Sequence, residues 1–210
     1  MKATELSISG AWMFEPTVFP DSRGSFTAPF QGAAFREALG FDLTVAQTNM
    51  SVSDRGVIRG VHYADLPPSQ AKYLYVASGV IRDVVVDIRV GSPTFGEFRV
   101  VELDADSMCA VYLSEGLGHA FQALTDHAVV GYLCSTPYNP AGEHGITPLD
   151  PELALPWAPG IEPVLSQKDR DAPTLADAVA AGSLPTWGAC QAWYEQLRTP
   201  SSTAGRPQAA

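Results

Sequence analysis

The chain has 210 residues, 46% of them hydrophobic and 17% charged, and its formal net charge is −10. This length fits one domain with a substantial core, and the excess of acids argues against nucleic acid and anionic membranes as partners. No apolar run approaches the length of a membrane span, and residues 1–5 already contain an acid, so we expect no signal peptide. The three cysteines lack metal-type spacing, which predicts a reduced, cytoplasmic protein.

The first element expected in chain order is a short helix over residues 33–39, ended by Gly40. The next signals are those of strands. Residues 80–89 read VIRDVVVDIR, a run that alternates apolar and charged side chains. Ser78-Gly79 just before it predicts a hairpin turn that joins this strand to one over residues 72–77.

Short strands follow at intervals of roughly ten residues, over residues 98–103, 109–113 and 128–133, which predicts an antiparallel sandwich or barrel. Helices return near the end. Thr174 is expected to cap a helix that runs to Ala181, and residues 187–198 predict another. We therefore predict one β domain over residues 1–198, and a tail over 199–210 that is disordered because it is rich in Ser, Thr, Pro and Ala.

Four histidines occur in the chain, His62, His119, His127 and His144. None belongs to an H-x-H pair followed by a glutamate, as in many metal-binding β barrels, so we expect no metal; a three-histidine site built from distant positions stays open. A single histidine is more often structural than catalytic, and a lysine such as Lys72 is more often a solvated charge. Taken one by one, these residues predict only a soluble β barrel with a polar site.

The motifs are far more specific in combination. In chain order they are Asp21-Ser22-Arg23-Gly24, Gln47-Thr48-Asn49, Arg59-Gly60-Val61-His62-Tyr63, Ser69-Gln70-Ala71-Lys72, DVVVDIRVGSPTFG from Asp83, Glu115-Gly116-Leu117-Gly118-His119, Tyr132-Leu133-Cys134, Tyr138-Asn139-Pro140, Glu143-His144-Gly145 and Ser166-Gln167-Lys168-Asp169. With this series the chain resembles the dTDP-4-dehydrorhamnose 3,5-epimerase family, including relatives that make antibiotic deoxysugars. The resemblance covers roughly residues 1–198, and the DVVVDIRVGSPTFG stretch alone is nearly diagnostic.

The resemblance implies an all-β, jelly-roll (cupin-type) barrel with short peripheral helices, which works as a homodimer without metal or cofactor. The implied substrate is a dTDP-linked 4-keto-6-deoxy sugar. Of the implied catalytic residues, His62 matches the base, Asp169 its paired carboxylate, Lys72 the cation at the C4 oxygen and Tyr132 the acid on the opposite face. The implied substrate-binding residues are Arg23, reaching across from the other subunit, with Gln47, Asn49, Arg59, His119, Tyr138 and Lys168.

Two positions depart from the family pattern. Ala28 stands where the family usually has a glutamate that helps to hold the nucleotide, and Ala120 replaces the glycine of a His-Gly-Phe motif. Both changes concern placement of the nucleotide or the sugar, and neither touches the acid–base set.

The implied chemistry explains why these residue types are needed. Inverting a carbon beside a ketone requires removal of its α-proton, and the resulting enolate oxygen needs a fixed positive or hydrogen-bonding partner, a role that suits Lys72. Histidine has an ordinary pKa of about 6.5, which suits a base at neutral pH. A carboxylate on its far nitrogen fixes the tautomer; Asp169 is the first candidate and Asp83 the second.

Three other functions remain open at this point. The first is an enzyme of the same kind that inverts only C3 or only C5, a difference that depends on how the sugar is oriented. The second is a metal-dependent cupin enzyme. The third is a non-catalytic module that binds sugar nucleotides, although the retention of His62, Lys72 and Tyr132 argues against it.

Overall fold

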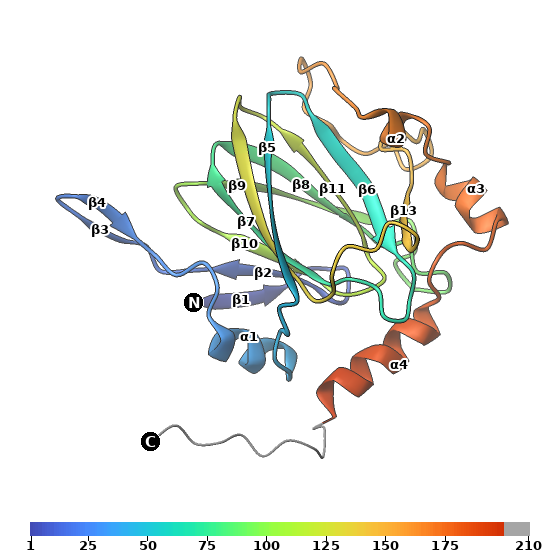
Figure 1. Cartoon of the computed structure of the whole chain (residues 1–210), viewed down its shortest axis with the longest axis horizontal. Helices are drawn as coiled ribbons and strands as arrows, with labels where there is room; N and C mark the ends of the chain where they lie inside the picture. The colour runs from blue at the N-terminus through green and yellow to red at the C-terminus, as the bar shows by residue number, and fades with distance from the viewer. Residues whose placement is uncertain (200–210) are drawn as a thin grey trace.

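The computed structural model describes residues 1–199, which form two antiparallel sheets packed face to face with helices at the edges (Figure 1). One sheet has six strands, in the order β1 (Lys2–Glu5), β2 (Ala11–Glu15), β10 (Ala110–Leu113), β7 (Lys72–Ser78), β12 (Ala128–Cys134) and β5 (Gln47–Ser53). The other has five, in the order β13 (Glu143–Gly145), β6 (Ile58–Ala64), β11 (Gly118–Ala123), β8 (Val80–Val86) and β9 (Phe98–Asp104). This is the jelly-roll arrangement that the family resemblance implied, and it confirms the antiparallel sandwich or barrel predicted from the strand pattern.

The main core lies between the two sheets. Leu74 and Val76 of β7 face Ile81 and Val85 of β8 within one fully buried cluster. Successive side chains of a strand point to opposite faces of the sheet, so every second residue of these strands faces the core. The core fills only part of the barrel, and the polar side chains of the candidate site occupy another part of the interior.

The predicted hairpin between residues 72–77 and 80–89 is wrong. The two strands exist as β7 and β8, but each belongs to a different sheet, and β8 pairs with β9 and β11 instead. Gly79 turns the chain between the sheets at a φ of +78°, in a space closed by Thr125 and Ala128. Crossing to the opposite sheet lets both strands direct apolar side chains into the same core.

The predicted helices are present. α1 (Gly32–Leu39) ends at Gly40 in the left-handed conformation, and its Phe35 packs with Tyr73 and Tyr112 on the outer face of the six-stranded sheet. α3 (Leu175–Ala180) begins with a capping box at Thr174 and covers the five-stranded sheet. The remaining helices are α2 (Gln167–Arg170) and α4 (Trp187–Arg198).

A two-stranded hairpin, β3 (Phe19–Asp21) and β4 (Gly24–Phe26), projects away from the barrel (Figure 1). The predicted tail lies outside the described residues except for Thr199, which caps α4. Within residues 1–199, no helix is long and apolar enough to cross a membrane.

Candidate active site

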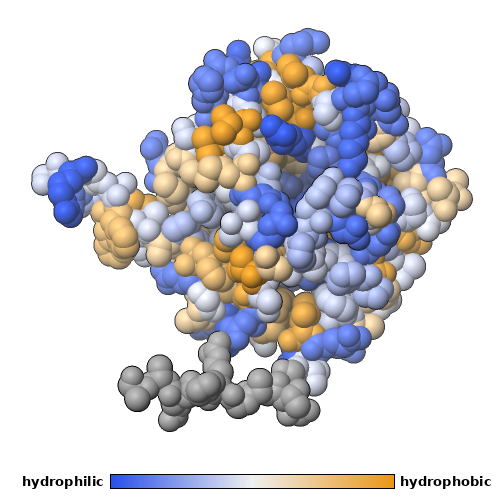
Figure 2. Space-filling view, in the orientation of Figure 1, coloured by the Kyte–Doolittle hydropathy of each residue, from blue (hydrophilic) through white to orange (hydrophobic). Residues whose placement is uncertain are grey.

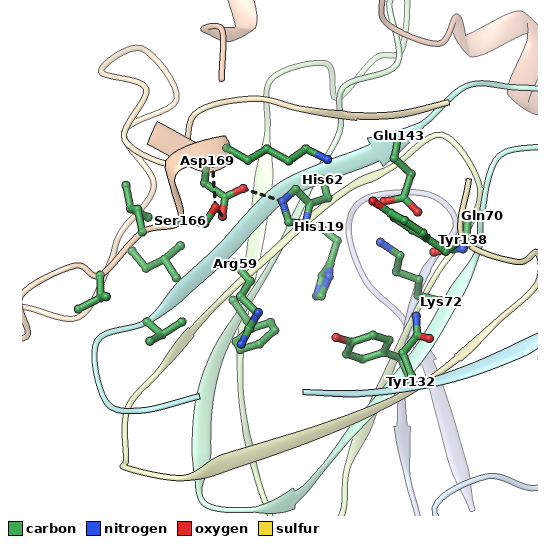
Figure 3. A pocket seen from close by; sticks show the side chains of 17 residues that line it. Arg59, His62, Gln70, Lys72, His119, Tyr132, Tyr138, Glu143, Ser166 and Asp169 are labelled. Atoms are coloured by element: carbon green, nitrogen blue, oxygen red, sulfur yellow. Dashed lines mark hydrogen bonds and ion pairs between the residues drawn. The ribbon is translucent and has the colours of Figure 1, made fainter. Parts of the chain in front are cut away.

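A cavity of about 530 Å³ opens at one end of the barrel between the two sheets. This volume is in the range of small-molecule sites. Figure 3 shows polar side chains from both sheets converging on it. Nine of the eleven residues that the sequence assigned to a site line this cavity: Asn49, Arg59, His62, Lys72, His119, Tyr132, Tyr138, Lys168 and Asp169.

His62 lies on β6, and its Nε2 atom is 2.7 Å from Oδ1 of Asp169 on α2. Burial raises the pKa of Asp169, but hydrogen bonds from His62 and Ser166, with the charges of His62 and Lys168, outweigh burial and leave that pKa below its usual value. The imidazole is 31% exposed and the carboxylate 7%, so the carboxylate lies behind the ring and the ring faces the cavity. A carboxylate on one ring nitrogen leaves the other, Nδ1, free to accept a proton.

Ser166 fixes the carboxylate from the other side. Its hydroxyl donates to Oδ2 of Asp169 at 2.8 Å and accepts from the backbone N–H of the same residue, as the N-cap of α2. Both oxygens of the carboxylate are therefore held by hydrogen bonds, and the rotamer of Asp169 is fixed before any substrate binds.

A second histidine–carboxylate pair lies beside the first. His119 on β11 is the register partner of His62, and its Nε2 atom is 2.6 Å from Oδ1 of Asp83 on β8. Asp83 is thus the partner of His119 and not of His62. The alternating charged residues of the 80–89 run include Asp83 and Asp87, and both are completely buried.

Lys72 begins β7, and its ammonium group points into the cavity toward the side where Glu143 and Tyr138 lie, with Tyr132 of β12 lining the same cavity (Figure 3). Burial of the Lys72 ammonium lowers its pKa, and the acidic groups of Glu143 and Cys134 oppose this effect only in part. A cation and a phenol therefore face the two histidines across the same space.

Two of the predicted substrate-binding residues lie outside the cavity lining. Gln47 contacts the lining through two hydrogen bonds: its side chain donates to Asn49 and accepts from the backbone N–H of Tyr138 at 3.0 Å. Arg23 is on the projecting hairpin, with a side chain that is 88% exposed and paired with Asp21. Arg23 does not reach the site of its own chain.

The two departures from the family pattern are also outside the lining. Ala28 follows the projecting hairpin. Ala120 points away from the cavity into an outer apolar cluster with Val61 and Val84, because its neighbours His119 and Phe121 take the inward positions on β11. Its methyl group packs against Gly60, which has a φ of +119° and no space for a Cβ atom.

Several residues of the lining were not predicted from the sequence. Gln70, Glu143 and Ser166 contribute polar groups, and Val57 and Val164 form part of an apolar wall. Ser166 had a readable signal, because Ser-x-x-Asp is the pattern of a helix N-cap. Glu143 had no such signal in the sequence, because it is brought close to Lys72 only by the pairing of β13 with β6.

The described part of the chain contains no set of side chains arranged as ligands for a metal ion. No group of three or more His, Cys, Asp or Glu side chains there has a geometry that could hold a metal ion. In both histidine–aspartate pairs the Nε2 atom is taken by a carboxylate. The metal-free site expected from the sequence stays a prediction.

Comparison with known proteins gives consistent matches. A family model described as dTDP-4-dehydrorhamnose 3,5-epimerase matches residues 5–177. A dTDP-4-dehydro-6-deoxyglucose 3-epimerase from Streptomyces bikiniensis is 53% identical over 191 residues, 91% of this chain and 96% of the relative. A dTDP-4-dehydrorhamnose 3,5-epimerase from Mycolicibacterium smegmatis is 54% identical over 198 residues, 94% and 98% of the two chains. The crystal structure of a 3'-monoepimerase from Streptomyces bikiniensis in complex with dTDP-quinovose matches with a TM-score of 0.90 and 51% identity, over 92% of this chain and 98% of that one.

The fold and the named relatives together define the class of the protein, an isomerase built on a cupin-type jelly roll. The chain belongs to the dTDP-4-dehydrorhamnose 3,5-epimerase family.

Proposed function

We propose that the protein epimerises dTDP-4-keto-6-deoxy-D-glucose at C3 and C5, in the biosynthesis of rhamnose or of an antibiotic deoxysugar. The observation that carries this proposal is the convergence of the His62–Asp169 pair, Lys72 and Tyr132 on one cavity. These groups supply a base, an oxyanion partner and an acid, which are the three requirements of α-proton exchange beside a ketone.

In the proposed reaction, Nδ1 of His62 takes the proton from the carbon beside the ketone. The electrons of the broken C–H bond move into an enolate, whose oxygen faces the Lys72 ammonium. The negative Asp169 carboxylate stabilises the imidazolium formed. Tyr132 then donates its hydroxyl proton to the opposite face of the carbon, the ketone re-forms, and His62 and Tyr132 return to their starting protonation states by exchange with water.

The diphosphate of the substrate requires cations, and Arg59 and Lys168 line the same cavity. Nε of Arg59 donates to Ser53 at 3.0 Å, which holds its guanidinium in a fixed direction. A small group of cations inside a protein with a net charge of −10 focuses an anionic ligand into the cavity. Tyr138 is exposed enough to stack on a base.

We further propose that the active form is a homodimer. The projecting hairpin exposes Phe19 by 59% and Phe26 by 71%, and β5 exposes Met50 by 70% (Figure 2 shows the hairpin standing clear of the body). Apolar side chains exposed to this degree on an extended arm favour contact with a second copy. In that assembly Arg23 would reach the cavity of the partner.

A second candidate is inversion at C3 alone. Relatives of nearly equal similarity carry the two names, 3-epimerase at 53% identity and 3,5-epimerase at 54%. The acid–base residues serve both reactions equally, because the difference lies in which carbon the sugar presents to His62.

One assay tests both candidates. The enzyme is incubated with dTDP-4-keto-6-deoxy-D-glucose and EDTA in D₂O, and the ring protons are followed by NMR. Deuterium at C3 and C5 supports the double epimerase, and deuterium at C3 alone supports the second candidate. Activity that disappears in EDTA and returns with added metal would favour the metal-dependent alternative, and binding without exchange at either carbon would favour the non-catalytic one.

A further inference from the structure

In the part of the chain that the structure describes, the Lys72 ammonium group is attracted by the charge of Glu143 but has no direct partner. Within residues 1–199 no hydrogen bond or ion pair holds its ammonium group, although the proposed function requires that group at a fixed point. A lysine side chain has four rotatable bonds and much rotamer entropy. The direction of Lys72 therefore depends on the backbone at the start of its strand as well as on the charge of Glu143, and the hydrogen bonds around that backbone affect how well the side chain is held.

Ser135 makes an unusual double connection at the start of this strand. The regular pairing of β7 with β12 ends at Lys72 and Cys134. One residue further, the backbone N–H of Ser135 donates to the carbonyl of Ala71 at 3.1 Å, and the Ser135 hydroxyl accepts from the backbone N–H of Ala71 at 2.8 Å. The side chain thus extends the sheet by one link, immediately before Lys72.

Glu115 holds the Ser135 hydroxyl in the direction that this link needs. The hydroxyl donates to Oε1 of Glu115 at 3.2 Å, which leaves a lone pair for Ala71. Glu115 is only 3% exposed, and burial raises the pKa of its carboxyl group. A residue of this type is seldom buried without a reason, and no other part of the proposed mechanism uses it.

The backbone of Glu115 is held from the C-terminal side of the chain. Tyr194 of α4 donates to the backbone carbonyl of Glu115 and lies beside Arg89. The side chain of Cys190 closes the space next to Gly116. Helix α4 lies beyond residues 5–177, the part that matches the family model, yet it supports the turn that presents Glu115.

We propose that Ser135 and Glu115 are positioning residues for Lys72, acting through the backbone of Ala71. This inference rests on the proposed role of Lys72. Loss of the Ser135 hydroxyl leaves the ammonium in the cavity but removes one of the two hydrogen bonds that hold Ala71, so the start of the strand is held less firmly. The enolate is then less well stabilised, while the nucleotide is bound as before.

The test is a double-mutant cycle of Ser135→Ala and Lys72→Ala, read as the rate of deuterium exchange and as kcat and KM. We expect Ser135→Ala to lower kcat roughly tenfold, with KM changed less than about twofold, because misplacement of a catalytic group slows chemistry more than binding. In the Lys72→Ala background the same substitution should change the exchange rate less than about twofold, since the two residues act as one unit. Ser135→Thr, which keeps the hydroxyl, should restore most of the lost rate.

Ser107→Ala is the matched control. The Ser107 hydroxyl also accepts from a backbone N–H, that of Cys109, and donates to a carboxylate, that of Asp104, but neither of these two partners is next to a residue of the cavity lining in the chain. This variant should keep the parent kcat. Glu115→Gln provides a second cycle if Ser135→Ala does not fold.

Two results would overturn the inference. One is an unchanged kcat in Ser135→Ala, and the other is an equal loss of rate with and without Lys72. Parent activity in Lys72→Ala would instead refute the role of Lys72 in the proposed function, and this inference with it.

Discussion

At the scale of single residues, the site combines two histidines from neighbouring strands, each held by its own aspartate. His62 pairs with Asp169 from a short helix, and His119 pairs with Asp83 from within the barrel. The His119–Asp83 pair is almost fully buried, whereas the His62 ring is one-third exposed. The more exposed ring is the better placed of the two to exchange a proton with substrate and then with water.

Lys72 gives a prediction for pH dependence. Burial lowers its pKa from the ordinary value of 10.5, so the charged form that stabilises the enolate is present below the shifted pKa and is lost as pH rises through it. We expect kcat/KM to fall on an alkaline limb that begins below pH 10.5. In Lys72→Arg the neutral rate should drop and the limb should move upward, because arginine stays charged.

The measurement is a pH profile of kcat/KM for both proteins, with protein stability checked at each pH by circular dichroism. Lys2→Arg, at an exposed position away from the cavity, is the control. An alkaline limb at the same pH in the parent and in Lys72→Arg would mean that another group controls it.

At the scale of elements, local sequence signals predicted the helices well, whereas the alternation of apolar residues predicted the strands but not all of their pairings. The helices α1, α3 and α4 have local start and stop signals, such as Gly40 and Thr174. The strands β7 and β8 were found, but their pairing was not, because Ser78-Gly79 has the same local sequence in a hairpin as in a crossing between sheets. Strand pairing depends on which side of each strand packs against the core, and that core is built by residues that are far away in the chain.

The residues of the site also differ in how far they could be predicted. Resemblance to the family found nine lining residues, whereas periodicity alone identified no catalytic residue, because His62, Lys72 and Asp169 meet only through the fold. Periodicity also gave no hint that the charged side of the 80–89 run, with Asp83 and Asp87, is buried inside the protein.

The attachment of α4 to the barrel yields a stability prediction. Asp87 and Arg89 form a fully buried ion pair with Nη2 and Oδ2 atoms 2.7 Å apart, and the Arg89 guanidinium lies 4.6 Å from the Trp187 ring centre of α4. We expect Arg89→Met to lower the free energy of unfolding by roughly 3–5 kcal/mol, because it leaves a carboxylate buried without its cation.

Urea unfolding followed by tryptophan fluorescence measures this loss. Lys2→Met, which breaks an exposed pair with Glu15, serves as the control and should cost less than about 1 kcal/mol. Equal losses in the two variants would show that the buried pair does not fasten the helix.

At the scale of the whole molecule, the projecting hairpin is the feature that a single chain does not explain. Arg23 is almost fully exposed, and it is too far out on the hairpin to line the cavity of its own chain. In the proposed homodimer, Arg23→Ala should raise KM roughly tenfold and change kcat less than about twofold, because it removes a contact to the nucleotide and not to the reacting carbon.

Light scattering and steady-state kinetics check this prediction together. We expect the mass of two chains for both proteins, with the kinetic defect confined to Arg23→Ala. Arg55→Ala, outside the hairpin and the cavity lining, is the control. A fully active single chain, or an Arg23→Ala variant with the parent KM, would contradict the exchange of hairpins.

The most direct test of the whole account is the exchange of the C3 proton in D₂O by the parent and by His62→Ala. His62 is the base on which every proposed step depends, and its removal leaves the binding residues Arg59 and Lys168 in place. We expect exchange to slow by a factor of about 10² to 10⁴ in His62→Ala, the usual contribution of a positioned base, while dTDP binding and the unfolding transition are retained. Exchange at the parent rate in a folded His62→Ala protein would contradict the account.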